Sequence, residues 1–129
     1  MKKELLLLTS LVMGFFAMSW ANDNVKIFSP KDFKIGLQKD TAAVILDVRR
    51  PSEFAEGHIK GSINIDWLDI EKFKAEAEKL DENKTYFVYC RSGKRSNAAA
   101  REMVKHGLKV IDLQGGILLW KQQGFEVVK

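Results

Sequence analysis

Apolar and polar positions follow two different patterns along residues 25–129. Short apolar runs of strand length are separated by segments in which apolar residues recur at helical spacing. The run 42–48, AAVILDV, is continuous, which is typical of a strand covered on both faces. The segment 67–80 has a helical repeat, and the apolar residues on its shared face are Leu68, Phe73, Ala77 and Leu80. The pattern predicts strands that alternate with helices.

The same pattern locates each expected element along the chain. Strands are expected at 25–28, 42–48, 62–66, 84–90 and 108–113, and helices at 29–38, 51–57, 67–80, 96–107 and 115–124. Ser29 is the expected cap of the first helix, with Pro30 at its first position, and Asp66 is the candidate cap of the third. Gly107 is expected to end the fourth helix. This alternation predicts an α/β fold with a mostly parallel sheet between helices.

The first residues have the order of a secretory signal peptide. Two lysines precede the apolar run Leu5–Met18, and Ser19 and Ala21 stand where small residues are found at a cleavage site. The run is shorter than the roughly 20 apolar residues that a bilayer span needs. We expect cleavage after Ala21, so that 1–21 are the signal peptide and 22–129 the mature domain. An uncleaved anchor is the alternative, and both predict a domain exported to the periplasm.

Composition narrows the class of protein further. The chain of 129 residues carries 21 Lys and Arg against 17 Asp and Glu, a net charge of +4, and the two signs are interspersed. This pattern is typical of a soluble surface and does not indicate a nucleic-acid partner. The length predicts one domain. We expect that domain to be a monomer with no stable membrane association after cleavage.

Cys90 is the only cysteine, in the stretch CRSGKRS, so it cannot form an internal disulfide. The preceding strand brings it to the end of the sheet, and a helix begins shortly after it. The amides of such a loop and helix start favour an anion, and nearby basic residues stabilise a thiolate. Gly93 allows the backbone to curl around the sulfur. A reactive thiol is therefore expected, with an inert buried cysteine as the alternative.

We expect the loop after Cys90 to bind the substrate. Arg91 and Lys94 are expected to face it, and Arg95 either faces it or pairs with Glu53 or Asp47 to fix the loop. Ser92 and Ser96 are candidates for hydrogen bonds or helix capping. The predicted substrate-binding residues are Arg91, Ser92, Gly93, Lys94, Arg95 and Ser96.

Residues outside this loop are weaker candidates. Arg49 is a candidate for the rim of the site, whereas Asp47 and His58 are expected to be structural. His106 is expected to stabilise the end of a helix. One cysteine and two distant histidines do not indicate a metal site.

Three motifs resemble the rhodanese family of sulfurtransferases. The first is 44–65, VILDVRRPSEFAEGHIKGSINI; the second is YCRSGKRS; and the third is 113–127, LQGGILLWKQQGFEV. Their order and separation match those of the family, and the short exported chain resembles the small periplasmic thiosulfate sulfurtransferases of bacteria. The resemblance implies a five-stranded, mostly parallel sheet flanked by helices on both faces.

The resemblance also implies a reaction. Cys90 would take the outer sulfur of thiosulfate as a persulfide and pass it to cyanide or a thiol, in a ping-pong mechanism that needs no metal or organic cofactor. A persulfide carrier and a non-catalytic binding module of the same fold are the alternatives. Cysteine-dependent phosphatases resemble the loop but have one residue more between the cysteine and the arginine. A redox protein is disfavoured because no second cysteine is present to resolve an oxidised thiol.

Overall fold

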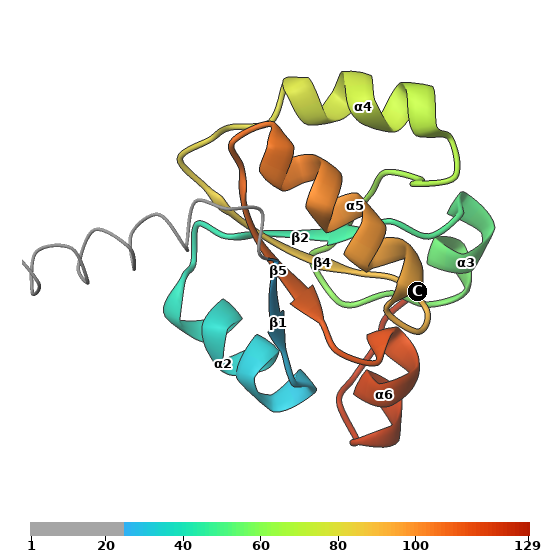
Figure 1. Ribbon diagram of the computed structural model, residues 1–129. Coiled ribbons are helices and arrows are strands. Elements are labelled where there is room, and N and C mark those ends of the chain that lie inside the picture. Colours follow the sequence, from blue (N-terminus) through green and yellow to red (C-terminus); the bar gives the residue numbers. More distant parts are fainter. Residues whose placement is uncertain (1–24) are drawn as a thin grey trace, which may run out of the picture.

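The computed structural model describes residues 25–129 (Figure 1). The expected signal peptide, 1–21, lies outside the described residues. The strands are β1 (Lys26–Phe28), β2 (Val44–Asp47), β3 (Ile63–Asn64), β4 (Thr85–Tyr89) and β5 (Lys109–Leu113). The helices are α2 (Pro30–Lys39), α3 (Pro51–Glu56), α4 (Ile70–Glu78), α5 (Lys94–Lys105) and α6 (Gly116–Gln122).

The five strands form one sheet in the order β1-β5-β4-β2-β3, and every neighbouring pair is parallel. The α/β fold class and the five-stranded sheet are therefore confirmed. β4 is the central strand, with Val88 opposite Leu46 of β2 and Asp112 of β5. Its last four residues, Tyr86–Tyr89, are all buried. The carboxyl end of the most buried strand thus leads directly to Cys90.

Helices cover both faces of the sheet (Figure 1). Because strand side chains alternate between faces, Val88 and Cys90 point to the side of α4 and α5, whereas Phe87 and Tyr89 point to the side of α2 and α6. Phe73 of α4 and Met103 of α5 complete the first core, and Phe33, Ile117 and Trp120 belong to the second. Cys90 therefore lies on the face that α5 covers.

Two helices begin at different residues from those expected. The third expected helix, 67–80, begins only at Ile70, and Asp69 rather than Asp66 precedes it. Asp66 instead accepts a hydrogen bond from the amide of Leu68 at 2.9 Å, which holds a turn before the helix. The fourth helix begins at Lys94, two residues before Ser96, because Gly93 has a positive φ of 104° and closes the loop early.

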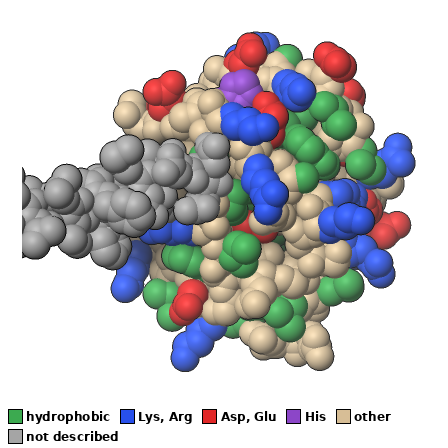
Figure 2. Space-filling model, viewed as in Figure 1, with side chains coloured by type: hydrophobic (Ala, Val, Ile, Leu, Met, Phe, Trp, Pro, Cys, Tyr) green, Lys and Arg blue, Asp and Glu red, His purple; other side chains and the backbone are tan. Residues whose placement is uncertain are grey.

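The first helix matches its expected start in detail. Ser29 accepts a hydrogen bond from the amide of Asp32 at 3.2 Å, and Pro30 is the first helical residue. Figure 2 shows Lys and Arg side chains interspersed with Asp and Glu on the face that it presents. Within residues 25–129, none of the helices combines the length and the apolarity that crossing a bilayer would require.

Candidate active site

Cys90 follows β4 directly and is only 1% exposed. Its Sγ accepts a hydrogen bond from the amide of Gly93, with N and Sγ 3.1 Å apart. The positive φ of Gly93 turns the chain so that this amide faces back toward the sulfur, a conformation that costs little only for glycine. The loop thus closes around the thiol in three residues, 91–93.

The loop and the first turn of α5 also carry amides that the protein does not use. Within residues 25–129, the backbone N–H groups of 91, 92, 94, 95 and 96 make no hydrogen bond. The first N–H groups of a helix lack partners inside it, and the helix dipole adds partial positive charge there. The amide of Gly93 already binds the sulfur, and the other amides give the start of α5 further donors suited to an anion.

Helix α6 explains why the donors remain free. Its amides at Ile117 and Leu118 donate to the carbonyl oxygens of Cys90 and Arg91, at 2.9 and 3.1 Å. The contact is close, because a Cβ atom on Gly116 would lie 2.3 Å from the carbonyl oxygen of Arg91. The carbonyl groups that begin the loop are therefore bound to α6 instead of competing for the loop's own amides.

Arg95 is paired with Glu53 of α3. Its two terminal nitrogens contact the two carboxylate oxygens at 2.7 and 3.0 Å, a bidentate pair. This hydrogen bonding lowers the pKa of Glu53 to about 2. Of the two roles expected for Arg95, the structure shows the pairing with Glu53, which ties the start of α5 to α3. Asp47 binds a different arginine.

That arginine is Arg49, which is only 6% exposed. Its Nε and Nη2 atoms bind the carboxylate of Asp47, with a shortest distance of 2.7 Å, and Nη2 also donates to the carbonyl of Gly57 at 2.7 Å. Asn64 donates from its side chain to the backbone oxygens of Asp47 and Arg49, both at 2.9 Å. Asp47 thus binds neighbouring protein groups, as expected for a residue with a structural role.

The other candidates differ in how they are placed. Arg91 and Ser92 of the loop and Lys94 at the start of α5 are exposed. Ser96 is buried, and its hydroxyl donates to the carbonyl of Gly93 at 3.3 Å. The loop candidates therefore divide into exposed side chains that could meet a ligand and one buried side chain that supports the loop.

The two histidines lie in structural surroundings. The ring of His58 stacks on that of Phe54, with 3.8 Å between the ring centroids. Nδ1 of His58 lies 2.8 Å from the backbone carbonyl oxygen of Phe54. His106 contacts Glu102 one helical turn earlier, at 3.0 Å. Among the residues that the structure describes, no group of three His, Cys, Asp or Glu side chains could hold a metal ion.

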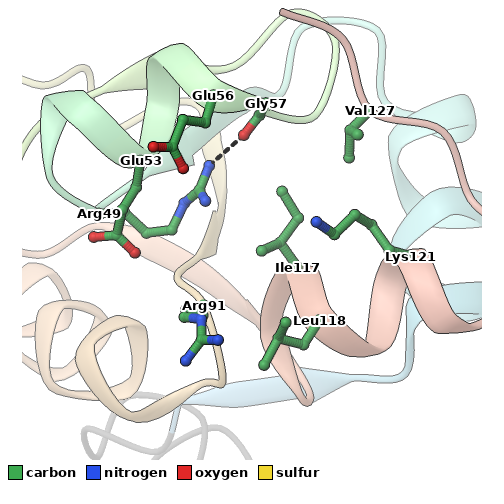
Figure 3. Close-up of a pocket in the computed structure, with 9 residues that line it drawn as sticks. All are labelled: Arg49, Glu53, Glu56, Gly57, Arg91, Ile117, Leu118, Lys121 and Val127. Carbon is green, nitrogen blue, oxygen red and sulfur yellow. Dashed lines mark hydrogen bonds between the residues drawn. The ribbon is translucent and has the colours of Figure 1, made fainter.

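A cavity of about 300 Å³ adjoins the loop between α3 and α6 (Figure 3). Its lining residues are Arg49, Glu53, Glu56, Gly57, Arg91, Ile117, Leu118, Lys121 and Val127. Sequence reasoning did not identify Glu56, Leu118, Lys121 or Val127. The helical spacing of Ile117 and Lys121 was the available signal, but it could not show that α6 packs beside α3.

Comparison with known proteins agrees with this architecture. Residues 29–123 match the rhodanese-like domain family. The thiosulfate sulfurtransferase GlpE of Stutzerimonas stutzeri is 39% identical over 84 residues, which are 64% of this chain and 74% of that protein. YrkF of Bacillus subtilis, a protein named as a candidate sulfur carrier, is 39% identical over 89 residues, 68% of this chain. The matched part is only 46% of YrkF, so the chain spans less than half of that relative.

A solved structure supports the same grouping. The rhodanese-related protein of Thermoplasma volcanium has a TM-score of 0.70 and 34% identity, over 80% of this chain and 97% of that one. The match therefore includes nearly all of that protein. On the fold, the cysteine loop and these likenesses, the chain belongs to the rhodanese-like domain family.

Proposed function

We propose that the chain is a sulfurtransferase that carries sulfur on Cys90 as a persulfide, with thiosulfate as donor and cyanide or a thiol as acceptor. Family membership and relatives named for sulfur transfer support sulfur transfer in general. One observation carries the proposal further: the amide of Gly93 lies 3.1 Å from Cys90 Sγ, in a loop whose other amides have no acceptor within residues 25–129.

In the first half-reaction, the Cys90 thiolate attacks the outer sulfur of thiosulfate. The sulfur–sulfur bond of thiosulfate breaks, its electron pair leaves with sulfite, and the outer sulfur remains on Cys90. The free amides then stabilise the charge on the terminal sulfur, as donors do in an oxyanion hole. The exposed side chains of Arg91 and Lys94 attract the dianionic donor to the loop.

In the second half-reaction, the acceptor attacks the terminal sulfur of the persulfide. The bond to Cys90 breaks, and the electron pair returns to Sγ as a thiolate. No general base is needed when the acceptor arrives as cyanide or a thiolate. The scheme has two separate displacements at one sulfur, so it predicts ping-pong kinetics.

The size of the loop argues against a phosphatase. Only Arg91, Ser92, Gly93 and Lys94 separate Cys90 from Arg95. The guanidinium of Arg95 is bound to Glu53 through both of its terminal nitrogens. A short ring and an occupied arginine suit a single sulfur atom better than a tetrahedral phosphate.

The alternative is a persulfide carrier that hands its sulfur to a protein partner. The likeness to YrkF favours this second candidate, because that relative is named as a candidate carrier. Both functions use the Cys90 persulfide and differ only in the acceptor. Rapid turnover with small acceptors distinguishes the enzyme from the carrier.

The deciding experiment measures intact mass and sulfite together. Treatment with thiosulfate should add the mass of one sulfur atom to the protein and release one equivalent of sulfite. Cyanide should then remove the sulfur as thiocyanate. A phosphate-ester hydrolysis assay is run in parallel. Protein that gains no sulfur from thiosulfate but hydrolyses the phosphate ester would overturn the proposal. A stable persulfide without turnover would favour the carrier.

The proposed compartment is the periplasm, on the basis of the signal pattern in residues 1–21. Expression of the full chain in a Gram-negative host, followed by osmotic release, tests this location. The released protein should begin at Asn22. Full-length protein in the cytosolic fraction would contradict the prediction.

A further inference from the structure

Arg49 has one nitrogen that its neighbours leave free. Nε and Nη2 are bound to Asp47 and Gly57, but within residues 25–129 Nη1 has no hydrogen-bond acceptor. In the described part of the chain, only one side-chain nitrogen or oxygen is both fully buried and unpaired, and it is Oδ1 of Asp112. Nη1 of Arg49 is unpaired, so it must be accessible to solvent. A guanidinium that is otherwise buried and fixed therefore presents two N–H groups to the cavity that it lines.

Charge in this cavity favours an anion. Lys121 and Arg91 line it and have no ion-pair partner within residues 25–129, whereas Glu53 is already bound to Arg95. Glu56 is the single unpaired acid of the lining in the described chain. In Figure 3 the amine of Lys121 and the guanidinium of Arg49 point into the same space from opposite sides. Within residues 25–129, the lining thus carries two unpaired cations and one fixed donor against one unpaired carboxylate.

The cavity also adjoins the backbone of the loop that begins at Cys90. Ile117 lines the cavity, and its amide is bound to the carbonyl oxygen of Cys90 at 2.9 Å. Arg91, the next residue after Cys90, lines it as well. Ile117, Leu118 and Val127 give the lining an apolar side that could hold a short hydrocarbon chain. A small molecule in the cavity could thus place one end beside the loop of Cys90.

We propose that this cavity binds the carboxylate of the acceptor, so that the preferred acceptors are small thiols that carry a carboxylate. Arg49 Nη1 and the Lys121 amine hold the carboxylate, and the hydrocarbon chain lies along α6 toward the loop. The acceptor thiolate attacks the terminal sulfur of the Cys90 persulfide, and the bond to Sγ breaks with its electron pair. This inference rests on the proposed function.

The kinetic test compares acceptors that differ only in charge. 3-Mercaptopropionate and 3-mercaptopropionamide are matched in length and serve as the two acceptors. The persulfide is first formed from thiosulfate. The kcat/KM of each acceptor is then divided by the fraction of its thiol that is ionised. We expect the carboxylate to be favoured about tenfold, as two charged contacts predict. Mercaptoacetate and 4-mercaptobutyrate extend the series, and one length should be favoured. Equal kcat/KM for the acid and the amide at every length would overturn the inference.

Two variants with opposite expected effects exclude a merely structural cause. Lys121→Gln should reduce the preference for the carboxylate about fivefold, and Glu56→Gln should increase it about twofold. Lys74→Gln, at an exposed position of α4, is the matched control and should leave the preference unchanged. Shifts of both cavity variants in the same direction would contradict a charge-based site.

A binding measurement separates this inference from the proposed function. Propionate, added to the unmodified protein, should shift the amide resonances of Gly57, Ile117, Leu118 and Val127, and propionamide should not. This result requires no sulfur transfer, so it supports the site even if thiosulfate leaves no persulfide. Equal responses to propionate and propionamide would overturn the site, whether or not cyanide turnover is normal.

Discussion

Burial alone does not show whether Cys90 is an inert or a reactive thiol. The residue packs among the core residues of the α5 face and is 1% exposed, as a structural cysteine would be. Its sulfur nevertheless accepts a hydrogen bond from the amide of Gly93, in a loop whose other amides have no acceptor within residues 25–129. The backbone around the sulfur, rather than its exposure, is what distinguishes Cys90 from a structural cysteine. Deep placement also limits attack on the sulfur to small reagents.

Cys90→Ser should abolish sulfur transfer and leave the fold intact. Serine fills nearly the same space but cannot form a persulfide, so turnover with thiosulfate should fall at least about a thousandfold. The free energy of unfolding should change by less than about 1 kcal/mol, because volume and burial are almost conserved. Sulfite release and thermal denaturation measure the two effects. Residual turnover near the wild-type rate would remove Cys90 from the mechanism.

Lys94→Ala should weaken the use of thiosulfate more than it weakens the fold. Lys94 is exposed at the first position of α5, directly after the cysteine loop, so its charge is available to a dianion. We expect kcat/KM for thiosulfate to fall about fivefold, and the difference to shrink at high salt. Lys105→Ala, in the last turn of the same helix, is the control for the loss of a lysine. Equal effects of the two substitutions would show that Lys94 has no specific contact with the donor.

At the scale of elements, the cysteine loop depends on its contact with α6. Gly116→Ala places a Cβ 2.3 Å from the carbonyl oxygen of Arg91, whereas Gly124→Ala meets nothing within 4 Å. Both glycines have positive φ, 62° and 86°, so each substitution costs about 1 kcal/mol in backbone strain. The clash at Gly116 should add about 2 kcal/mol and displace the loop.

Chemical denaturation and sulfite release from thiosulfate test this contact. Gly116→Ala should be less stable than Gly124→Ala and should also lose activity, because the displaced loop no longer directs its amides at the sulfur. Gly124→Ala should lose stability alone. Similar losses of stability and activity in both variants would mean that strain, and not the contact between α6 and the loop, determines them.

The pair between α3 and α5 should make stability depend on pH. Contact with Arg95 lowers the pKa of Glu53 from 4.5 to about 2. Its stabilising effect is therefore fully present above pH 4.5 and is lost as the pH falls toward 2. Relative to Glu53→Gln, the wild type should be more stable by about 1 kcal/mol at pH 7, with allowance for partial exposure. Denaturation at pH 2 to 7 measures this gap, which should close in acid; a gap that is independent of pH would contradict the pairing.

For the whole molecule, local patterns predicted the parallel sheet, the central strand and the residues around Cys90. Each of these depends on short stretches, such as the apolar run of β4 or the glycine of the loop. The cavity depends on how α3 and α6, distant in sequence, lie next to each other, and no local pattern contains that relation. The partner of Arg95 was ambiguous for the same reason. The sequence offered Glu53 and Asp47, and only the packing of Arg49 against Asp47 separates them.

Asp112 is a buried acid that local patterns did not mark, and it should limit the stability of the whole domain near neutral pH. It is 2% exposed under the first turn of α5, and its Oδ1 has no partner within residues 25–129. Burial is the largest cause that raises the pKa of Asp112, from 3.8 to about 6. The folded state thus holds a proton that the unfolded state releases at lower pH. The wild type should lose about 2–3 kcal/mol between pH 4 and pH 6.

Asp112→Asn removes this titration and should reveal it. The free energy of unfolding of the variant, measured in urea, should rise relative to that of the wild type by about 2–3 kcal/mol from pH 4 to pH 7. The informative quantity is how the difference in free energy of unfolding between variant and wild type changes with pH, because any difference in packing is the same at each pH. Glu78→Gln, at an exposed position of α4, controls for the loss of one acid. A constant gap for Asp112→Asn would mean that the Asp112 carboxylate finds a partner in solution, and that its burial does not limit the stability of the domain.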